Sequence, residues 1–276
     1  MLKLRVITAV VLLLLFLLAL FALPVYGWVA LVVVVVMQGA SEWARLSGLT
    51  GLRANFFWVL TLAMLLILVW LDASQPGEKQ VFVHMLVYSV SALLWLIVVP
   101  TWLMTGWKVK DPILMALVGW AVLIPTGLAM MDLRLFDPSP WVLLFVMGLV
   151  SAADISAYFA GKRFGKNKLA PSISPGKTWE GVAGAMLGVS VYVLLVWSFS
   201  PFFSQRELLP ILLLASWWWV VLAVIGDLFE SAVKRQAGVK DSGALLPGHG
   251  GLLDRIDALT STLPLAALAI LLQSLS

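Results

Sequence analysis

Long apolar runs, separated by short polar stretches, make up almost the whole chain. An α-helix needs about twenty mostly apolar residues to cross the hydrocarbon of a bilayer, so such runs predict membrane spans. Nine are predicted, near residues 4–22, 25–40, 55–71, 81–103, 112–130, 140–160, 180–199, 208–229 and 258–274. The second run is short and follows Pro24 directly, so one of the first two could be re-entrant, which would leave eight full crossings. The pattern predicts an all-α, polytopic integral membrane protein with about nine transmembrane helices.

Composition excludes a soluble globular domain, because 62% of the residues are hydrophobic and only 12% are charged. The first run follows Lys3 and Arg5 and could be a secretory signal, but it lacks a clear small-x-small cleavage pattern, which favours a retained helix. The chain has no cysteine, so disulfides and thiolate chemistry are excluded. Zinc is disfavoured, because His84 and His249 are the only histidines.

Basic residues predict the orientation, because Lys and Arg concentrate in the cytoplasmic loops of membrane proteins. With the N-terminus inside, the inner segments hold 15 of the 18 Lys and Arg residues. The three others are Lys79, Arg134 and Arg206. We therefore expect a multi-pass protein of the inner cell membrane whose N-terminus and two longest polar loops are cytoplasmic, with the active site at that face.

The two parts of the chain differ in their chemistry. Residues 1–137 hold apolar helices with few charges and no recognisable site, which indicates a transmembrane helical scaffold or a dimer surface. Residues 138–276 hold two polar loops rich in charge, which indicates a catalytic region. No repeat of matched halves, as in many transporters, is visible.

The first polar loop begins inside a span, at Asp154. This carboxylate lies about six residues, or roughly 9 Å, below the end of its predicted helix, where an unpartnered charge costs at least a few kcal/mol. A structural ion pair is one explanation, and a polar site shared with Ser151 and Tyr158 on the same helix face is the other. Beyond it, five basic residues alternate with glycines. They either contact anionic lipid headgroups or, with main-chain N–H groups that glycine exposes, bind phosphate. The Walker A spacing is absent.

The second loop runs from Asp227 to Asp257. Lys234 follows Asp227 by two turns on about the same face, and Asp254 and Asp257 are one turn apart at the start of the last span. Three carboxylates therefore converge at one membrane surface. Oxygen ligands without Cys or His suit a hard cation such as Mg²⁺, and nearby cations suit phosphates, so the loop predicts phosphoryl or nucleotidyl transfer. A structural salt-bridge network is the alternative.

The second loop also resembles a known family. The run Ser231-x-x-Lys234-Arg235, then Lys240-Asp241, then HGGLLDRID over residues 249–257, is similar to the signature of the phosphatidate cytidylyltransferases, or CDP-diacylglycerol synthases. The stretch from Asp154 to Gly181 resembles a second motif of that family. One departure is Ile155-Ser156, where a smaller pair such as Thr-Gly or Thr-Ala is expected, and it concerns local helix packing.

The resemblance implies a reaction in which CTP and phosphatidic acid give CDP-diacylglycerol and pyrophosphate, with Mg²⁺ as cofactor and a second cation left open. The lipid bilayer is the environment, a homodimer is left open, and no nucleic acid is involved. The hypothesised catalytic residues are Asp227, Lys234, Arg235, Lys240, Asp241, His249, Asp254 and Asp257. Of these, Asp227, Asp254 and Asp257 are the expected metal ligands. The hypothesised nucleotide-binding residues are Asp154, Lys166, Lys168, Ser174 and Lys177.

Two other classes of protein share some of these features. A polyprenyl-phosphate sugar-phosphate transferase would also combine membrane helices, Asp-rich loops and magnesium, but it would consume a UDP-sugar, and the HGGLLDRID run argues against it. A transporter is the non-enzyme alternative. It predicts charges near mid-membrane in several helices, whereas the spans before Asp154 hold almost none.

Overall fold

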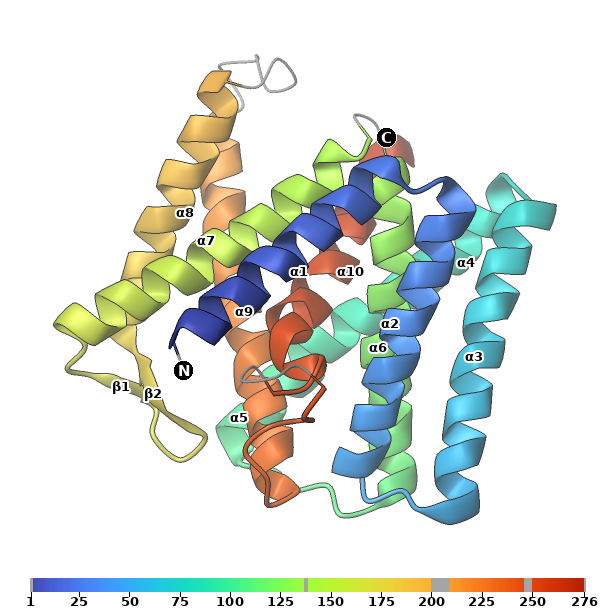
Figure 1. Ribbon diagram of the computed structural model, residues 1–276, viewed down its shortest axis with the longest axis horizontal. Coiled ribbons are helices and arrows are strands. Elements are labelled where there is room, and N and C mark those ends of the chain that lie inside the picture. Colours follow the sequence, from blue (N-terminus) through green and yellow to red (C-terminus); the bar gives the residue numbers. More distant parts are fainter. Residues whose placement is uncertain (1, 137–138, 200–208, 246–249, 276) are drawn as a thin grey trace.

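A computed structural model describes residues 2–136, 139–199, 209–245 and 250–275, with side chains described from Val10 onward. The chain folds into helices and one small hairpin (Figure 1). The elements are α1 (Leu2–Ala22), α2 (Val25–Leu46), α3 (Gly51–Ser74), α4 (Glu78–Leu93), the π-helical turn η1 (Leu94–Val98), α5 (Val99–Thr105), α6 (Pro112–Leu135), α7 (Trp141–Phe164), β1 (Lys168–Ala170), β2 (Ser174–Thr178), α8 (Trp179–Phe199), α9 (Leu209–Gln236) and α10 (Leu253–Leu275).

The helical membrane architecture is confirmed. Eight helical segments among the described residues are long and apolar enough to cross a membrane, and α4, η1 and α5 together form one of them. The second predicted run is not short, because α2 has 22 residues. The first predicted run lies in α1, where Val10–Ala22 forms a shorter apolar helix among the residues that the structure describes. The count of nine crossings stays a prediction.

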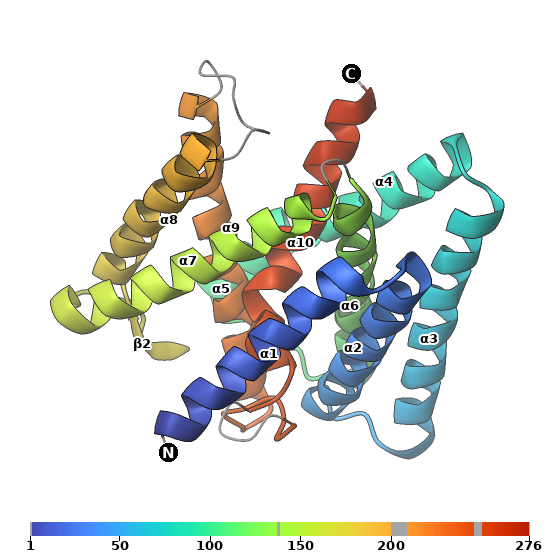
Figure 2. The ribbon, with the colours of Figure 1, turned by 45° about the horizontal axis from the view of Figure 1, so that its top comes forward.

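The polar connections sort to two ends of the molecule. In Figures 1 and 2 the β1–β2 hairpin, the α2–α3 turn, the end of α9 and the start of α10 lie at the lower end. The α3–α4 turn, the end of α6, the start of α7 and the end of α10 lie at the upper end. The segments that the basic residues predict to be cytoplasmic therefore share one end, which brings the two polar loops to the same side.

The span from Glu78 to Thr105 is continuous but irregular. Its middle turn, η1, has π-helical hydrogen bonding, and Pro100 follows in the first turn of α5, where its missing N–H is tolerated. Gly106, at φ 64°, ends the helix in the left-handed conformation that glycine adopts without strain. This end of α5 contacts α9 beside the second polar loop.

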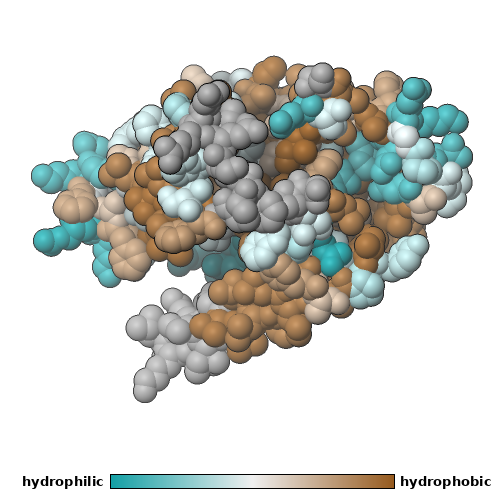
Figure 3. Space-filling view, turned by 90° about the horizontal axis from the view of Figure 1, so that it is seen from above, coloured by the Kyte–Doolittle hydropathy of each residue, from teal (hydrophilic) through white to brown (hydrophobic). Residues whose placement is uncertain are grey.

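The most buried spans are α6 and α10, whose most apolar windows are 67% and 61% buried. The outer helices present apolar side chains outward, as helices that face lipid tails do. Seen from the end opposite the hairpin, hydrophobic residues form much of the visible surface, and hydrophilic residues gather at its left and right edges (Figure 3).

Small residues set the packing of α7 against α8. A Cβ added at Gly184 would collide with Ala160, and one added at Gly188 would collide with the side chain of Ser156. Such small residues let membrane helices approach closely. Ser156 belongs to the Ile155-Ser156 pair that departs from the family pattern. Its side chain fits between α7 and α8 because Gly188, which faces it, has no side chain.

The first polar loop contains a structure that the sequence did not predict. Strands β1 and β2 pair antiparallel, with Lys168 opposite Thr178 and Ala170 opposite Ser174. The hairpin closes where Trp179 N–H donates to the Asn167 carbonyl at 3.0 Å. The all-α expectation is right for the membrane spans, and the hairpin is an exception in the connecting loop.

Candidate functional site at one end of the helix bundle

A pocket of about 480 Å³ lies where α7, the hairpin, α8 and α9 meet. Asp154 of α7, Ser174 and Lys177 of β2, and Asp227 of α9 all line it, so residues from the two predicted loops share one cavity. Lys177 forms an ion pair with Asp227, and both side chains are partly exposed. The pocket thus offers both carboxylates and a cation.

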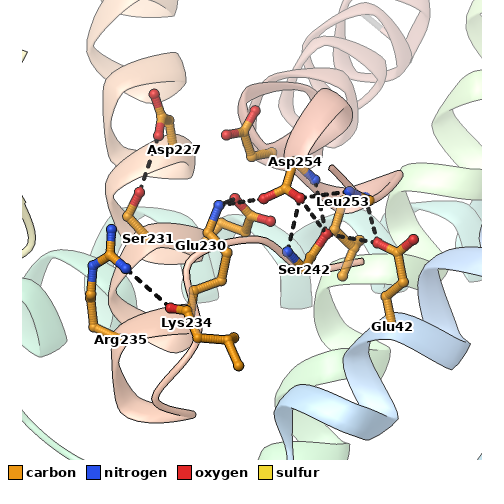
Figure 4. A network of polar contacts seen from close by, with 12 residues as sticks. Glu42, Asp227, Glu230, Ser231, Lys234, Arg235, Ser242, Leu253 and Asp254 are labelled. Carbon is orange, nitrogen blue, oxygen red and sulfur yellow. Dashed lines mark hydrogen bonds and ion pairs between the residues drawn. The ribbon is translucent and has the colours of Figure 1, made fainter. Parts of the chain in front are cut away.

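Below Asp227, a lysine on α9 connects two carboxylates. Lys234 Nζ lies 2.6 Å from Glu230 Oε2 and 2.6 Å from Asp254 Oδ1 (Figure 4). Only 10% of the Lys234 side chain is exposed, so its positive charge is balanced mainly by these two carboxylates. Ser231, one turn after Asp227, donates a long hydrogen bond of 3.4 Å to Asp227 Oδ1.

Asp254 organises the loop that precedes α10. Its Oδ2 accepts hydrogen bonds from Ser242 N and Gly251 N, both at 2.8 Å, and lies 3.0 Å from Ser242 Oγ. Gly250, at φ 80°, makes the turn that brings these groups together, and Asp241 lies beside it. Because Oδ2 is occupied by loop donors, only Oδ1, which already faces Lys234, could face a metal ion.

Glu42 of α2 is a residue of this site that the sequence did not predict. Its carboxylate accepts hydrogen bonds from Leu252 N at 2.9 Å, Leu253 N at 3.0 Å and Ser242 Oγ at 2.8 Å, and Glu42 is 3% exposed (Figure 4). It therefore binds N–H groups at the start of α10, where a helix favours negative charge. Only a lone acidic residue in an apolar helix hinted at this role, and these three partners lie 200 to 211 residues away along the chain.

Glycines let the loop approach that carboxylate. A Cβ at Gly243 would lie 2.7 Å from Glu42 Oε1, and one at Gly251 would collide with Glu42 Oε2 and Ser242 Oγ. Neither position has room for a side chain. Gly251, which belongs to the glycine-rich run of the second motif, therefore allows the loop to contact Glu42 of α2.

The carboxylates near the pocket repel one another. Asp257 interacts electrostatically with Asp227, Glu230 and Asp154. Its Oδ1 accepts a hydrogen bond from Ala258 N at 2.8 Å. Glu230 Oε1 is buried and has no hydrogen-bond partner among the described atoms. A buried, unsatisfied carboxylate oxygen beside several others fits a hard cation, because Mg²⁺ takes oxygen ligands.

The other predicted residues lie around this centre. Arg235 points away from Asp254 and donates to the Val239 carbonyl at 3.1 Å (Figure 4). Lys240 is exposed at the start of the α9–α10 loop. Lys166 and Lys168 are exposed at the base of the hairpin and do not line the pocket. His249 lies outside the described residues.

A second group that could hold a metal lies near the opposite end of the molecule. Ligand atoms of Asp72, His84 and Asp132 lie within 4.8 Å of one another. His84 Nε2 lies 2.8 Å from Asp72, its Nδ1 lies 2.8 Å from Asp132, and Tyr88 donates to Asp132 at 2.6 Å. These contacts join α3, α4 and α6, so the group ties three helices together whether or not a metal is bound.

The fold and the site define a polytopic membrane protein whose carboxylates and cations suit nucleotidyl transfer. The family model of the cytidylyltransferases matches residues 3–273. The chain belongs to this family, whose members are nucleotidyltransferase enzymes. It is 38% identical to a phosphatidate cytidylyltransferase of Haemophilus influenzae over 96% of both chains. It is also 38% identical to one of Pseudomonas aeruginosa, over 97% of this chain and 96% of the relative. One of Brucella abortus is 45% identical over 43% of both chains.

Proposed function

We propose that this protein transfers the cytidylyl group of CTP to phosphatidate and releases pyrophosphate. The observation that supports this most directly is the pocket in which Asp154, Ser174 and Lys177 of the first motif meet Asp227 of the second. A nucleotidyl transfer needs carboxylates for a metal and cations for phosphates in one place. In this proposal the site lies on the cytoplasmic face of the inner membrane, because CTP is dissolved in the cytoplasm.

The reaction needs no protein nucleophile. A phosphate oxygen of phosphatidate attacks the α-phosphorus of CTP, the new P–O bond forms, and the bond to the β-phosphate oxygen breaks as pyrophosphate leaves. Positioning and charge neutralisation supply the catalysis. Lys177 in the pocket neutralises phosphate charge, and Lys166, Lys168, Arg235 and Lys240 attract and orient the two anionic substrates.

Magnesium suits these oxygen donors by its chemistry, although among the described residues no three of the carboxylates have ligand atoms within 4.8 Å of one another, as Asp72, His84 and Asp132 do. Asp227 and Asp257 would hold the ion, with Asp254 Oδ1 as a third ligand and Glu230 beside it. When bound, the ion supplies positive charge that offsets the charge developing on the phosphates. Lys177 is paired with Asp227 in the structure, and we expect it to turn toward a nucleotide phosphate when the metal binds.

The test is a reconstituted reaction. Purified protein in neutral detergent micelles, given radiolabelled CTP, phosphatidate and Mg²⁺, should form CDP-diacylglycerol and pyrophosphate in equal amounts. Asp227→Asn should abolish turnover with the fold intact, and Ser231→Ala, which removes only a weak contact to the same carboxylate, should retain most of it. Turnover of a UDP-sugar with polyprenyl phosphate, and none with CTP, would establish the rival transferase instead.

A further inference from the structure

A second pocket, of about 320 Å³, lies next to the first. Three separate segments enclose it: the end of α5 with the turn that follows, the tip of the β1–β2 hairpin, and the last turns of α9. Figure 1 shows these segments close together at the lower end of the molecule. Hydrogen bonds between Gln236 and the main chain of Val109, at 2.9 Å and 2.5 Å, hold the turn after α5 against α9.

The lining of this pocket combines cations with apolar surface. Lys108 and Arg235 supply the charge, and Trp102, Trp107 and Ile173 supply much of the apolar wall. Among the residues that the structure describes, none of those lining it is acidic. Trp102 is held rigidly, because its ring packs edge-on against Phe229 at 5.3 Å. A site with two cations and no carboxylate favours an anion, and its apolar wall favours an anion attached to hydrocarbon.

The pocket is also placed where a lipid can reach it. Ile97 and Met104, on the span that ends at the pocket, are 58% and 87% exposed, as expected for side chains that face lipid tails. Trp107, which also lines the pocket, is 53% exposed, and tryptophan is enriched at the level of the headgroups.

The two pockets share two structural elements. Strand β2 and α9 line the first with Lys177 and Asp227, while the hairpin tip and α9 line the second with Ile173 and Arg235. Arg235 follows Asp227 by eight residues, about 12 Å along the helix axis, so both pockets take residues from one stretch of α9 little more than two turns long.

We propose that this second pocket binds the phosphomonoester headgroup of the lipid substrate, with Lys108 and Arg235 on the phosphate and the tryptophans and Ile173 against the glycerol and acyl chains. The inference rests on the proposed function, because it assigns the lipid substrate to one pocket and the nucleotide to the other. The shared hairpin would then let one substrate influence the binding of the other.

A binding experiment tests the pocket independently of catalysis. Because the chain has no cysteine, Ser172→Cys places a single thiol on the pocket wall. Dioctanoyl phosphatidate in neutral micelles, without CTP, should slow the reaction of this thiol with N-ethylmaleimide at least fivefold, and dioctanoylglycerol should not. The same probe at Gln75→Cys, in the α3–α4 turn at the opposite end, should show no protection. Protection by CTP alone would overturn the assignment and make this a nucleotide pocket.

Kinetics give a second, independent test with a matched control. Lys108→Gln should raise the KM for phosphatidate about fivefold, equivalent to about 1 kcal/mol, and leave the KM for CTP unchanged. Lys110→Gln removes a charge two residues away that does not line the pocket, so its kinetics should stay within twofold of the parent protein. If the parent protein forms CDP-diacylglycerol but phosphatidate does not protect the thiol of Ser172→Cys and Lys108→Gln does not change the KM for phosphatidate, the lipid pocket is refuted. The proposed function is not affected by that result. Protection without any CDP-diacylglycerol would refute the function and leave the pocket.

Discussion

At the residue scale, the contact of Glu42 with the second motif leads to a prediction. Glu42→Gln keeps the size of the side chain but replaces one acceptor oxygen with a donor group that opposes Leu252 N–H or Leu253 N–H. An unsatisfied buried donor costs about 1–3 kcal/mol, so the loop before α10 should lose order and kcat should fall about tenfold or more. Steady-state kinetics with purified variants measure this.

Ser41→Ala is the matched control for Glu42. Ser41 precedes Glu42 in α2, and its hydroxyl donates a hydrogen bond within its own helix, to the Met37 carbonyl at 3.0 Å. Its turnover should be close to normal. If Glu42→Gln also turns over within twofold of the parent protein, Glu42 does not position the loop.

Two lysines of the second motif should differ in what their loss does. Lys234 is 8% exposed and pairs with Glu230 and Asp254, so Lys234→Gln leaves two buried carboxylates without their cation. Breaking such a buried pair costs about 3–5 kcal/mol, and the protein should unfold at a clearly lower temperature in detergent. Lys240→Gln removes an exposed charge and should leave the melting temperature within about 1 °C. Equal melting temperatures for both variants would show that the buried pairs contribute no stability.

At the scale of elements, the glycine side of α8 predicts a helix-packing defect that a second substitution corrects. Gly188→Ala places a methyl group on Ser156 of α7, and overpacking of this kind costs about 1–3 kcal/mol. Ser156→Gly in the same chain should restore most of the lost thermal stability. Gly176→Ala is the control, because no atom lies within 4 Å of its added Cβ. Additive effects of the two substitutions at 156 and 188 would show that these residues are not in contact.

The sequence predicted elements whose signal is local. Apolar runs revealed the spans, and the spacing of Asp154, Lys177 and Asp227 in the motifs revealed residues that share the pocket. The sequence did not predict the hairpin because its strands have only three and five residues. The second strand contains Pro175 and Gly176, a composition typical of loops. The sequence did not predict the role of Glu42 because its hydrogen-bond donors are main-chain N–H groups at the start of α10, more than 200 residues later in the chain.

At the scale of the whole molecule, helices of the predicted scaffold contact the region that holds the two motifs. Glu42 of α2 binds the loop before α10, Gln236 of α9 binds the turn after α5, and α6 packs against α10. The two parts of the chain are therefore joined at the end that carries the motifs. A scaffold role for residues 1–137 includes positioning the second motif.

The sorting of loops to two ends predicts which side of the membrane each one faces. Ser172→Cys in the hairpin and Gln75→Cys in the α3–α4 turn both lie at exposed positions, at opposite ends of the bundle. Basic residues favour the cytoplasm for the hairpin end, so a membrane-impermeant maleimide added to intact cells should label Gln75→Cys and leave Ser172→Cys unlabelled. In inverted vesicles the pattern should reverse. Because the parent chain has no cysteine, it serves as the background control in both preparations. Labelling of Ser172→Cys from outside intact cells would contradict the orientation and would place the proposed nucleotide pocket on the side without CTP.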